Sequence, residues 1–342
     1  MKTKKIVTIG GGTGSFTLLS GLKKYPVDIS AIVSMADDGG STGVLRDELG
    51  VLPPGDVRQC LVALSDSSEQ LRTLMNYRFE EGALKGHSFG NIFLSALEKI
   101  HGSFGEGVYQ ARRILNVKGQ VLPVTAQDAR LFMELGDGTV LNGENEINHS
   151  QELQKKGVEK MYFSPRVRAN KEAIRAIEQA DLVVIGPGNH YCSILPNFLI
   201  KGIAEAVKKT PAKVVYNCNL VNKPGHSEGF TLDDYVEEVE KYIGKGRIDY
   251  ATFNTKLPRK NVLEKYEAAR EMLVTFDAPR AAKRNYRVVR TDMLSNAQVR
   301  YSVADMLSSK RAFIRHDSDK LAKVIMMIAE MGEYESILGE MV

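Results

Sequence analysis

The feature that most constrains this chain is a glycine-rich turn between its first predicted strand and its first predicted helix. Residues 5–9 are mostly apolar and β-branched, which favours a buried strand, and residues 10–15 read GGGTGS. Apolar residues at helical spacing over 16–22 predict a helix, and residues 28–34 predict a second strand. Such a βαβ unit pairs its two strands in parallel. The chain is therefore expected to fold around a parallel sheet.

The rest of the chain repeats this alternation. Further strands are predicted at 120–124, 181–185, 213–216 and 248–253, with helical patterns between them. We therefore predict an α/β fold: a Rossmann-like, doubly wound, mainly parallel sheet with helices on both faces, in one large domain over residues 1–342.

One segment departs from the alternation. The sequence Gly136-Asp137-Gly138 lies between two apolar runs and is typical of a hairpin turn. It predicts a small antiparallel annex at about 131–163. The polar residues 142–156 are expected to form a loop.

Composition and cysteine spacing narrow the classes of partner and location to be expected. Lys and Arg number 46 against 42 for Asp and Glu, so the net charge of +4 makes no case for nucleic acid as a partner. No apolar run approaches the length of a membrane span, so no transmembrane segment is expected. The three cysteines, Cys60, Cys192 and Cys218, are too far apart for a disulfide framework. This usage fits a reducing, cytoplasmic location.

The glycine turn is the first candidate binding site. Glycine allows a close backbone approach to a phosphate, and the following helix offers free N–H groups at its start. This reasoning selects Gly11, Gly12, Thr13 and Gly14 as nucleotide contacts. Ser15 stands where the dinucleotide fingerprint has glycine. The alternative is a tight turn that binds nothing.

An acidic loop follows the second predicted strand and should face the glycine turn. Its carboxylates, Asp37 and Asp38, are of the type that holds ribose hydroxyls or Mg²⁺, which makes them candidate metal ligands. A solvated Asp-Gly turn is the alternative.

Two further loops each open a predicted helix. Arg58 lies in a first helical turn, where the helix dipole disfavours a cation, and is a candidate phosphate contact. Its neighbour Asp56 is expected to cap that helix. Asn91, in the segment GHSFGN, offers donors to a ligand or belongs to a plain helix cap. His87 in the same segment is either structural or catalytic.

A second glycine turn follows the apolar strand DLVVI and completes the predicted crevice. Cys192 has no recognisable His–acid partner, so a thiol nucleophile is not expected and no catalytic residue is assigned. The predicted ligand contacts after this strand and the next one are Gly186, Pro187, Gly188, Asn189, Asn217 and Asn219.

Taken together, the motifs resemble a known family. The chain carries, in order, GGGTG, DDGGSTG, PPGDVR, GHSFGN, LPVTAQD, GPGNHYCSILPN and YNCNLVNKPG. This order resembles the gluconeogenesis factor family (YvcK-like), a relative of the phospholactate transferases (CofD-like). The similarity spans about residues 5–329.

The resemblance implies a cytoplasmic regulatory protein that binds the nucleotide sugar UDP-N-acetylglucosamine and is needed for gluconeogenic growth and normal cell shape. By family match, Tyr266 and Arg315 contact that ligand. The family usually has small hydroxyl residues in the region of residues 189–192, where this chain reads NHYC.

Other hypotheses stay open at this point. One alternative to the regulatory protein is an enzyme, a metal-dependent transferase of the phospholactate transferase type. Another alternative is an NAD-binding protein. A homo-oligomer is one further hypothesis. A regulatory kinase acting on Ser318 is another, with a helix cap as the plain role of that hydroxyl.

Overall fold

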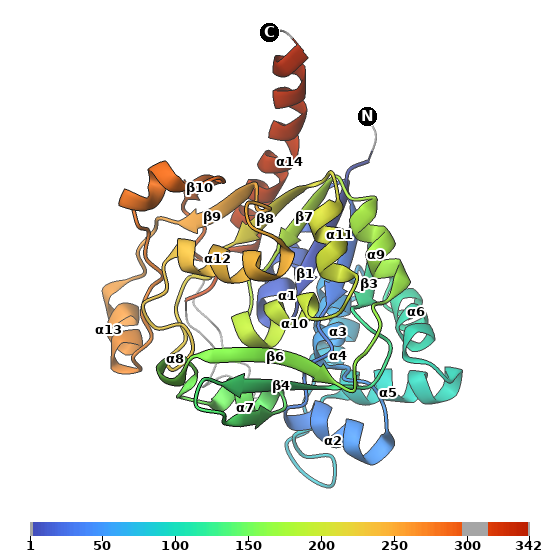
Figure 1. The fold of residues 1–342 in the computed structure, drawn as a ribbon. Helices are drawn as coiled ribbons and strands as arrows, with labels where there is room; N and C mark the ends of the chain where they lie inside the picture. The colour runs from blue at the N-terminus through green and yellow to red at the C-terminus, as the bar shows by residue number, and fades with distance from the viewer. Residues whose placement is uncertain (1–2, 296–313, 341–342) are drawn as a thin grey trace.

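The computed structural model describes residues 3–295 and 314–340. A seven-stranded parallel sheet forms the centre of the molecule, with strands in the spatial order β10-β9-β8-β7-β1-β2-β3 (Figure 1). The bounds of these strands are β1 (Lys5–Gly10), β2 (Asp28–Val33), β3 (Gln120–Pro123), β7 (Leu182–Ile185), β8 (Lys213–Asn217), β9 (Tyr250–Asn254) and β10 (Arg287–Thr291).

Strand β1 lies where the chain changes direction across the sheet. It pairs with β2 on one side and with β7 on the other, both in parallel. The chain first builds outward through β2 to β3, and then returns to build β7 to β10 on the other side. At such a switch point the loops that leave neighbouring strands diverge and open a crevice. The fold therefore opens a crevice beyond the carboxyl ends of β1, β7 and β8.

Helices cover both faces of the sheet, which confirms the predicted doubly wound architecture (Figure 1). On one face α1 (Gly12–Leu22) packs against α3 (Gly55–Leu64) and α14 (Ser318–Glu340). The helices that pack with one another on the other face are α9 (Lys171–Glu178), α10 (Leu195–Phe198), α11 (Ile203–Lys209) and α12 (Leu232–Ile243).

The remaining helices lie beyond the edges and ends of the sheet (Figure 1). They are α2 (Gly40–Leu49), α4 (Glu69–Asn76), α5 (Phe89–His101), α6 (Phe104–Ile114) and α13 (Lys260–Ala268). No helix in the described part of the chain is long and apolar enough to cross a membrane.

The antiparallel annex is confirmed. Strands β4 (Arg130–Leu135), β5 (Val140–Asn142) and β6 (Val158–Ser164) form a separate three-stranded sheet in the order β5-β4-β6. The loop expected over 142–156 is wrong in part, because α7 (Glu144–His149) and α8 (Leu153–Lys156) lie there. Ile147 and Leu153 are buried, so single apolar residues anchor these short helices.

One helix start and one helix cap differ from expectation. Helix α1 begins at Gly12 rather than at residue 16, so part of the glycine turn is its first turn. Helix α14 begins at Ser318 as expected, but Asp317, rather than Ser318, caps it: Asp317 Oδ1 accepts the N–H groups of Asp319 and Lys320, each at 3.0 Å. Backbone donors decide both boundaries, and apolar spacing does not report them.

Candidate functional site

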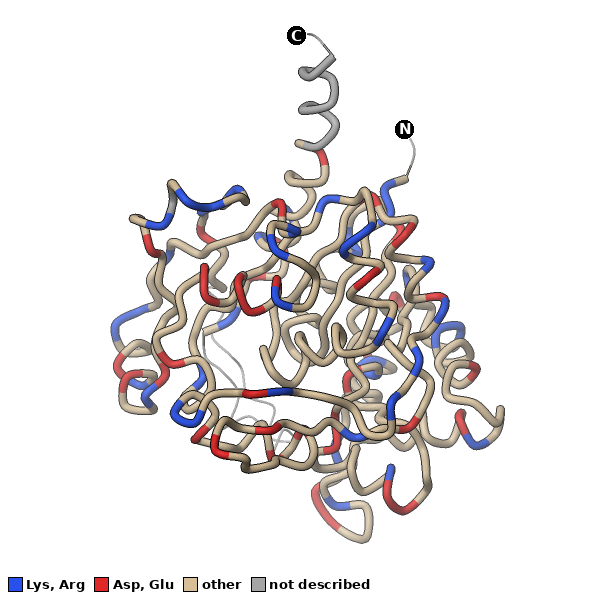
Figure 2. The backbone as a smooth tube through the Cα atoms, in the orientation of Figure 1, with Lys and Arg blue, Asp and Glu red and all other residues tan. Residues whose placement is uncertain are grey.

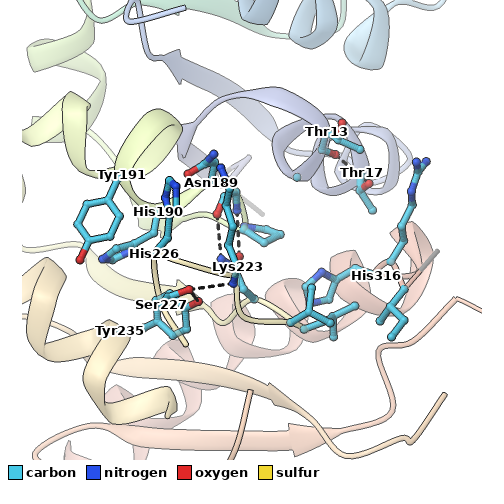
Figure 3. A pocket seen from close by; sticks show the side chains of 18 of the residues that line it. Thr13, Thr17, Asn189, His190, Tyr191, Lys223, His226, Ser227, Tyr235 and His316 are labelled. Atoms are coloured by element: carbon cyan, nitrogen blue, oxygen red, sulfur yellow. Dashed lines mark hydrogen bonds between the residues drawn. The ribbon is translucent and has the colours of Figure 1, made fainter. Parts of the chain in front are cut away.

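A cavity of about 510 Å³ opens at the predicted crevice (Figure 3). Its wall combines the first turn of α1, the loop after β7, the loop after β8 and the segment that precedes α14. Of the predicted contacts, those that line it are Thr13, Gly14, Pro187, Gly188, Asn189, Asn219 and Arg315.

The start of α1 supplies backbone donors to this cavity. The first N–H groups of a helix have no partner within the helix, and Thr13 and Gly14 occupy such positions. Gly14 also lies against the loop after β7, because a Cβ atom there would collide with the carbonyl oxygen of Pro187. A helix start that faces a cavity is suited to bind an anion.

Asparagine side chains hold the loop after β7 in place. Asn219 accepts a hydrogen bond from the Gly188 N–H at 3.2 Å and donates one to the Gly188 carbonyl at 2.9 Å. Asn217 donates to the Gly186 carbonyl at 3.2 Å and accepts from Thr252 at 3.0 Å. Asn217 is fully buried and does not line the cavity. Asn219 therefore supports the loop after β7 from within the cavity wall, and Asn217 supports it from behind that wall.

Lys223 is a cation at the cavity that the sequence analysis missed. Its Nζ donates to the backbone carbonyl and to the side-chain oxygen of Asn148, and Asn148 also accepts from Asn189 Nδ2 at 2.8 Å. Burial lowers the pKa of Lys223. A lysine held in this way brings positive charge to a partly desolvated wall.

Three histidines line the same cavity, and the sequence analysis missed all of them as site residues. Burial lowers the pKa of His190 to about 3, of His226 to about 4 and of His316 to about 4. All three imidazoles are therefore neutral at pH 7. Figure 3 shows His316 on the side of Thr13 and Thr17, and His190 and His226 on the opposite side, beyond Lys223.

Arg315 and Tyr266 occupy different positions relative to the cavity. Arg315 lines it, next to Ile314 and His316. Tyr266 is 5% exposed and packs in a small apolar cluster with Leu220 and Ile314, which lie on the wall. The structure thus brings the two residues to one region, with Arg315 at the cavity and Tyr266 behind it.

The acidic loop lies beside the cavity rather than on its wall. Asp37 accepts hydrogen bonds from Gly39 N–H at 3.1 Å and from Thr42 Oγ1 at 2.8 Å, while Asp38 accepts from Asn145 N–H at 2.7 Å. Among the described residues, no group of three or more His, Cys, Asp or Glu side chains is arranged to hold a metal ion. These carboxylates have local partners, and their role toward Mg²⁺ or ribose stays a prediction.

Arg58 and Asn91 join this acidic loop in one buried network. Arg58 Nε donates to Asn91 Oδ1 at 2.9 Å, and its Nη1 donates to Asn76 Oδ1 at 2.6 Å. Asn91 Nδ2 lies 3.4 Å from Thr42 Oγ1, which in turn donates to Asp37. The network links α2, α3, α4 and α5. It holds Arg58 away from the cavity wall, where a direct phosphate contact was predicted.

Asp56 lies next to the glycine turn. Helix α3 begins at Gly55, so Asp56 lies in its first turn rather than at its cap. It accepts the Gly12 N–H, and a Cβ atom on Gly11 would collide with its carboxylate. Burial, with the nearby charge of Asp37, raises the pKa of Asp56 well above its ordinary range. Gly11 and Gly12 therefore face a carboxyl group, whereas Thr13 and Gly14 face the cavity.

A second buried acid, Glu144, comes from the annex. Burial and the charge of Asp37 raise its pKa to about 7. Because residues 142–156 were expected to form a loop, Glu144 was not among the predicted site residues.

The comparisons with known proteins agree with this architecture. A family model described as 2-phospho-L-lactate transferase CofD matches residues 6–294. The gluconeogenesis factor of Bacillus subtilis is 39% identical over 94% of this chain and 96% of that protein. The chain belongs to the gluconeogenesis factor branch of the CofD family.

Other relatives support the same assignment. The gluconeogenesis factor of Listeria innocua is 35% identical over 94% of each chain. A crystal structure of a UPF0052 family protein from Bacillus halodurans is 36% identical, with a TM-score of 0.86 over 95% of this chain and 99% of that one. Both the recognised family and the predicted fold are thereby confirmed.

Proposed function

We propose that this gluconeogenesis factor is a nucleotide-sugar-binding regulatory protein whose ligand is UDP-N-acetylglucosamine. Its site of action is the cytoplasm, where it links carbon supply during gluconeogenic growth to cell shape. The observation that carries the proposal is the convergence on one cavity of the α1 start, Lys223 and Arg315. Backbone N–H groups and two cations match the negative charge of a diphosphate.

The size and form of the cavity support the same ligand class. A volume of about 510 Å³ falls within the range of small-molecule sites. The cavity has two differing ends, with the start of α1 and His316 at one, and Tyr191, Tyr235, His190 and His226 at the other. A molecule that joins a charged diphosphate to a neutral sugar has the same asymmetry.

A regulatory role is favoured over covalent catalysis by the state of Cys192, which follows the lining residue Tyr191. Burial raises the pKa of Cys192 well above its ordinary range, so its thiol is a poor nucleophile at neutral pH. The alternative function is a metal-dependent transferase, with which the match to the CofD model is compatible.

One set of measurements tests both functions. Calorimetric titration with UDP-N-acetylglucosamine, GTP and NAD should show binding of the UDP-sugar and a matching rise in melting temperature. Preference for GTP or NAD, with no UDP-sugar binding, would overturn the proposal. Incubation with the UDP-sugar and Mg²⁺ should leave the ligand intact by chromatography, whereas release of UDP or UMP would establish the enzymatic alternative.

A further inference from the structure

The end of the cavity farthest from α1 contains imidazole nitrogens without partners in the described part of the chain. His190 is 4% exposed, and neither of its ring nitrogens makes a hydrogen bond there. His226 Nε2 lies 3.1 Å from the carbonyl oxygen of Ser150, while its Nδ1 has no partner. A buried polar atom without a hydrogen bond is destabilising. This end of the cavity is therefore chemically incomplete without an occupant that forms hydrogen bonds.

The chemistry of the missing partner follows from the charge state of these rings. Burial keeps both imidazoles neutral, and the positive charges of Lys241 near His190 and Lys223 near His226 act in the same direction. A neutral imidazole has one N–H donor and one lone pair that accepts. A hydroxyl group, or the amide of an N-acyl group, complements it because each both donates and accepts. A carboxylate only accepts, so it pairs with the imidazole N–H and leaves the lone pair without a donor.

The surroundings of His190 limit how it moves. Its ring meets Tyr191 and Tyr235 edge to face, with ring centroids 5.0 Å and 5.1 Å away. Tyr235 is fixed in turn, because its hydroxyl donates to Asn222 Oδ1 at 2.9 Å and lies 2.8 Å from Ser227 Oγ. The ring lines the cavity, so rotation about its Cβ–Cγ bond is the movement that presents a nitrogen to a ligand.

We propose that the His190 end of the cavity is a specificity subsite for a neutral sugar that carries hydroxyl or N-acyl groups. This inference rests on the proposed function, and it assigns the two ends of the ligand. The diphosphate lies by Thr13 and Arg315, and the sugar lies against His190 and His226. Nucleotide sugars with a carboxylate on the sugar bind less tightly, because a carboxylate has no donor for the imidazole lone pairs.

The wild-type protein provides the first test, by calorimetry with UDP, UDP-N-acetylglucosamine and UDP-glucuronic acid. The N-acetylated sugar should bind at least tenfold more tightly than the acidic sugar. Equal affinity for all three would overturn the subsite and leave the nucleotide site standing. Binding of none of the three would overturn the proposed function itself.

His190→Leu provides the second test, because leucine has a similar volume and no polar atom. It should raise the melting temperature of the ligand-free protein, since a buried unpartnered group is removed. It should weaken UDP-N-acetylglucosamine binding about three- to tenfold and leave UDP binding unchanged. His190→Gln, which keeps a donor and an acceptor, should lose less.

The matched control is His101→Leu, a change at an exposed histidine at the end of α5. It should alter neither sugar affinity nor the preference between ligands. Wild-type affinity of His190→Leu for the N-acetylated sugar would overturn the subsite. If neither variant at position 190 folds, the wild-type ligand comparison decides the matter alone.

Discussion

The phenolic oxygen of Tyr266 accepts a hydrogen bond from the backbone N–H of Ile314 at 2.8 Å. The two residues are 48 positions apart, and Ile314 precedes Arg315 on the cavity wall. Tyr266 belongs to α13, so this bond ties a peripheral helix to the segment that carries the arginine. This bond predicts a positioning role for Tyr266, as an alternative to the ligand contact implied by the family.

Tyr266→Phe separates these two roles. The variant keeps the ring and removes the hydroxyl, so a stacking role would leave ligand affinity unchanged. If the hydroxyl positions residues 314–316, affinity for UDP-N-acetylglucosamine should fall severalfold, and stability should fall by about 1 kcal/mol. Calorimetry and urea unfolding measure the two effects. Tyr109→Phe, at a half-exposed tyrosine of α6, is the control and should change neither.

Arg315→Ala tests the cation at the cavity directly. A charge-assisted hydrogen bond contributes about 1.5–3 kcal/mol, so its loss should weaken binding about tenfold or more. The loss should shrink as salt is added, because the interaction is electrostatic. Arg113→Ala on the exposed face of α6 controls for a general change in charge. Equal affinity of Arg315→Ala and wild type at low salt would remove Arg315 from the site.

Much of the fold was predictable because its signals are local. Buried parallel strands such as β7 are continuous apolar runs, and glycine turns mark where they end. The antiparallel annex was less predictable than the central sheet. Its helix α7 has a single buried residue, Ile147, and gives no amphipathic pattern to detect. The start of α14 at Ser318 was expected, but its cap was not, because the capping acceptor is Asp317 rather than the Ser318 hydroxyl.

Only the part of the site that follows from the sheet topology was predictable. Carboxyl ends of adjacent parallel strands meet, which is why Thr13, Gly188 and Asn219 line one cavity. Lys223 and His226 follow β8 in a long loop, and no local pattern reports that such a loop folds back over the crevice. The placement of Arg58 also escaped prediction, since its partner Asn91 comes from a distant helix.

Asp38 connects the acidic loop to the annex, and this connection is testable. Its Oδ1 accepts the Asn145 N–H in the first turn of α7, so Asp38→Ala should lower stability by about 1 kcal/mol, as the loss of a helix cap does. Asp38→Asn keeps an acceptor oxygen and should cost less. If Asp38 also holds Mg²⁺, Asp38→Asn weakens nucleotide binding in MgCl₂ but not in EDTA. If Asp38→Asn binds the nucleotide as tightly as wild type in both buffers, Asp38 has the capping role alone.

Low pH should destabilise the protein through its buried histidines. The pKa of His190 is about 3 in the folded state, below its ordinary 6.5, so between these values the unfolded chain takes up a proton that the native state does not. Stability is therefore lost as pH falls below 6.5, by about 1.4 kcal/mol per pH unit for one such group. Between pH 7.5 and 5, His190→Leu should lose about 2 kcal/mol less than wild type in urea unfolding. An equal loss would mean that His190 titrates normally.

Gly14→Ala tests how closely α1 approaches the loop after β7. A Cβ atom at Gly14 would collide with the backbone of Pro187, and neither backbone segment is free to move, because α1 packs on α3 and Asn219 holds Gly188. Overpacking of this kind costs about 1–3 kcal/mol, and it should displace the helix start from the cavity and weaken ligand binding. Gly105→Ala is the matched control, since it lies in the first turn of α6 with no atom near the added methyl group. Because alanine favours helix, that control should hold or slightly raise stability. Urea unfolding and calorimetry of the two variants compare the same added methyl group at a crowded position and at an open one. If both variants change stability and ligand affinity equally, the approach of α1 to Pro187 does not constrain the site.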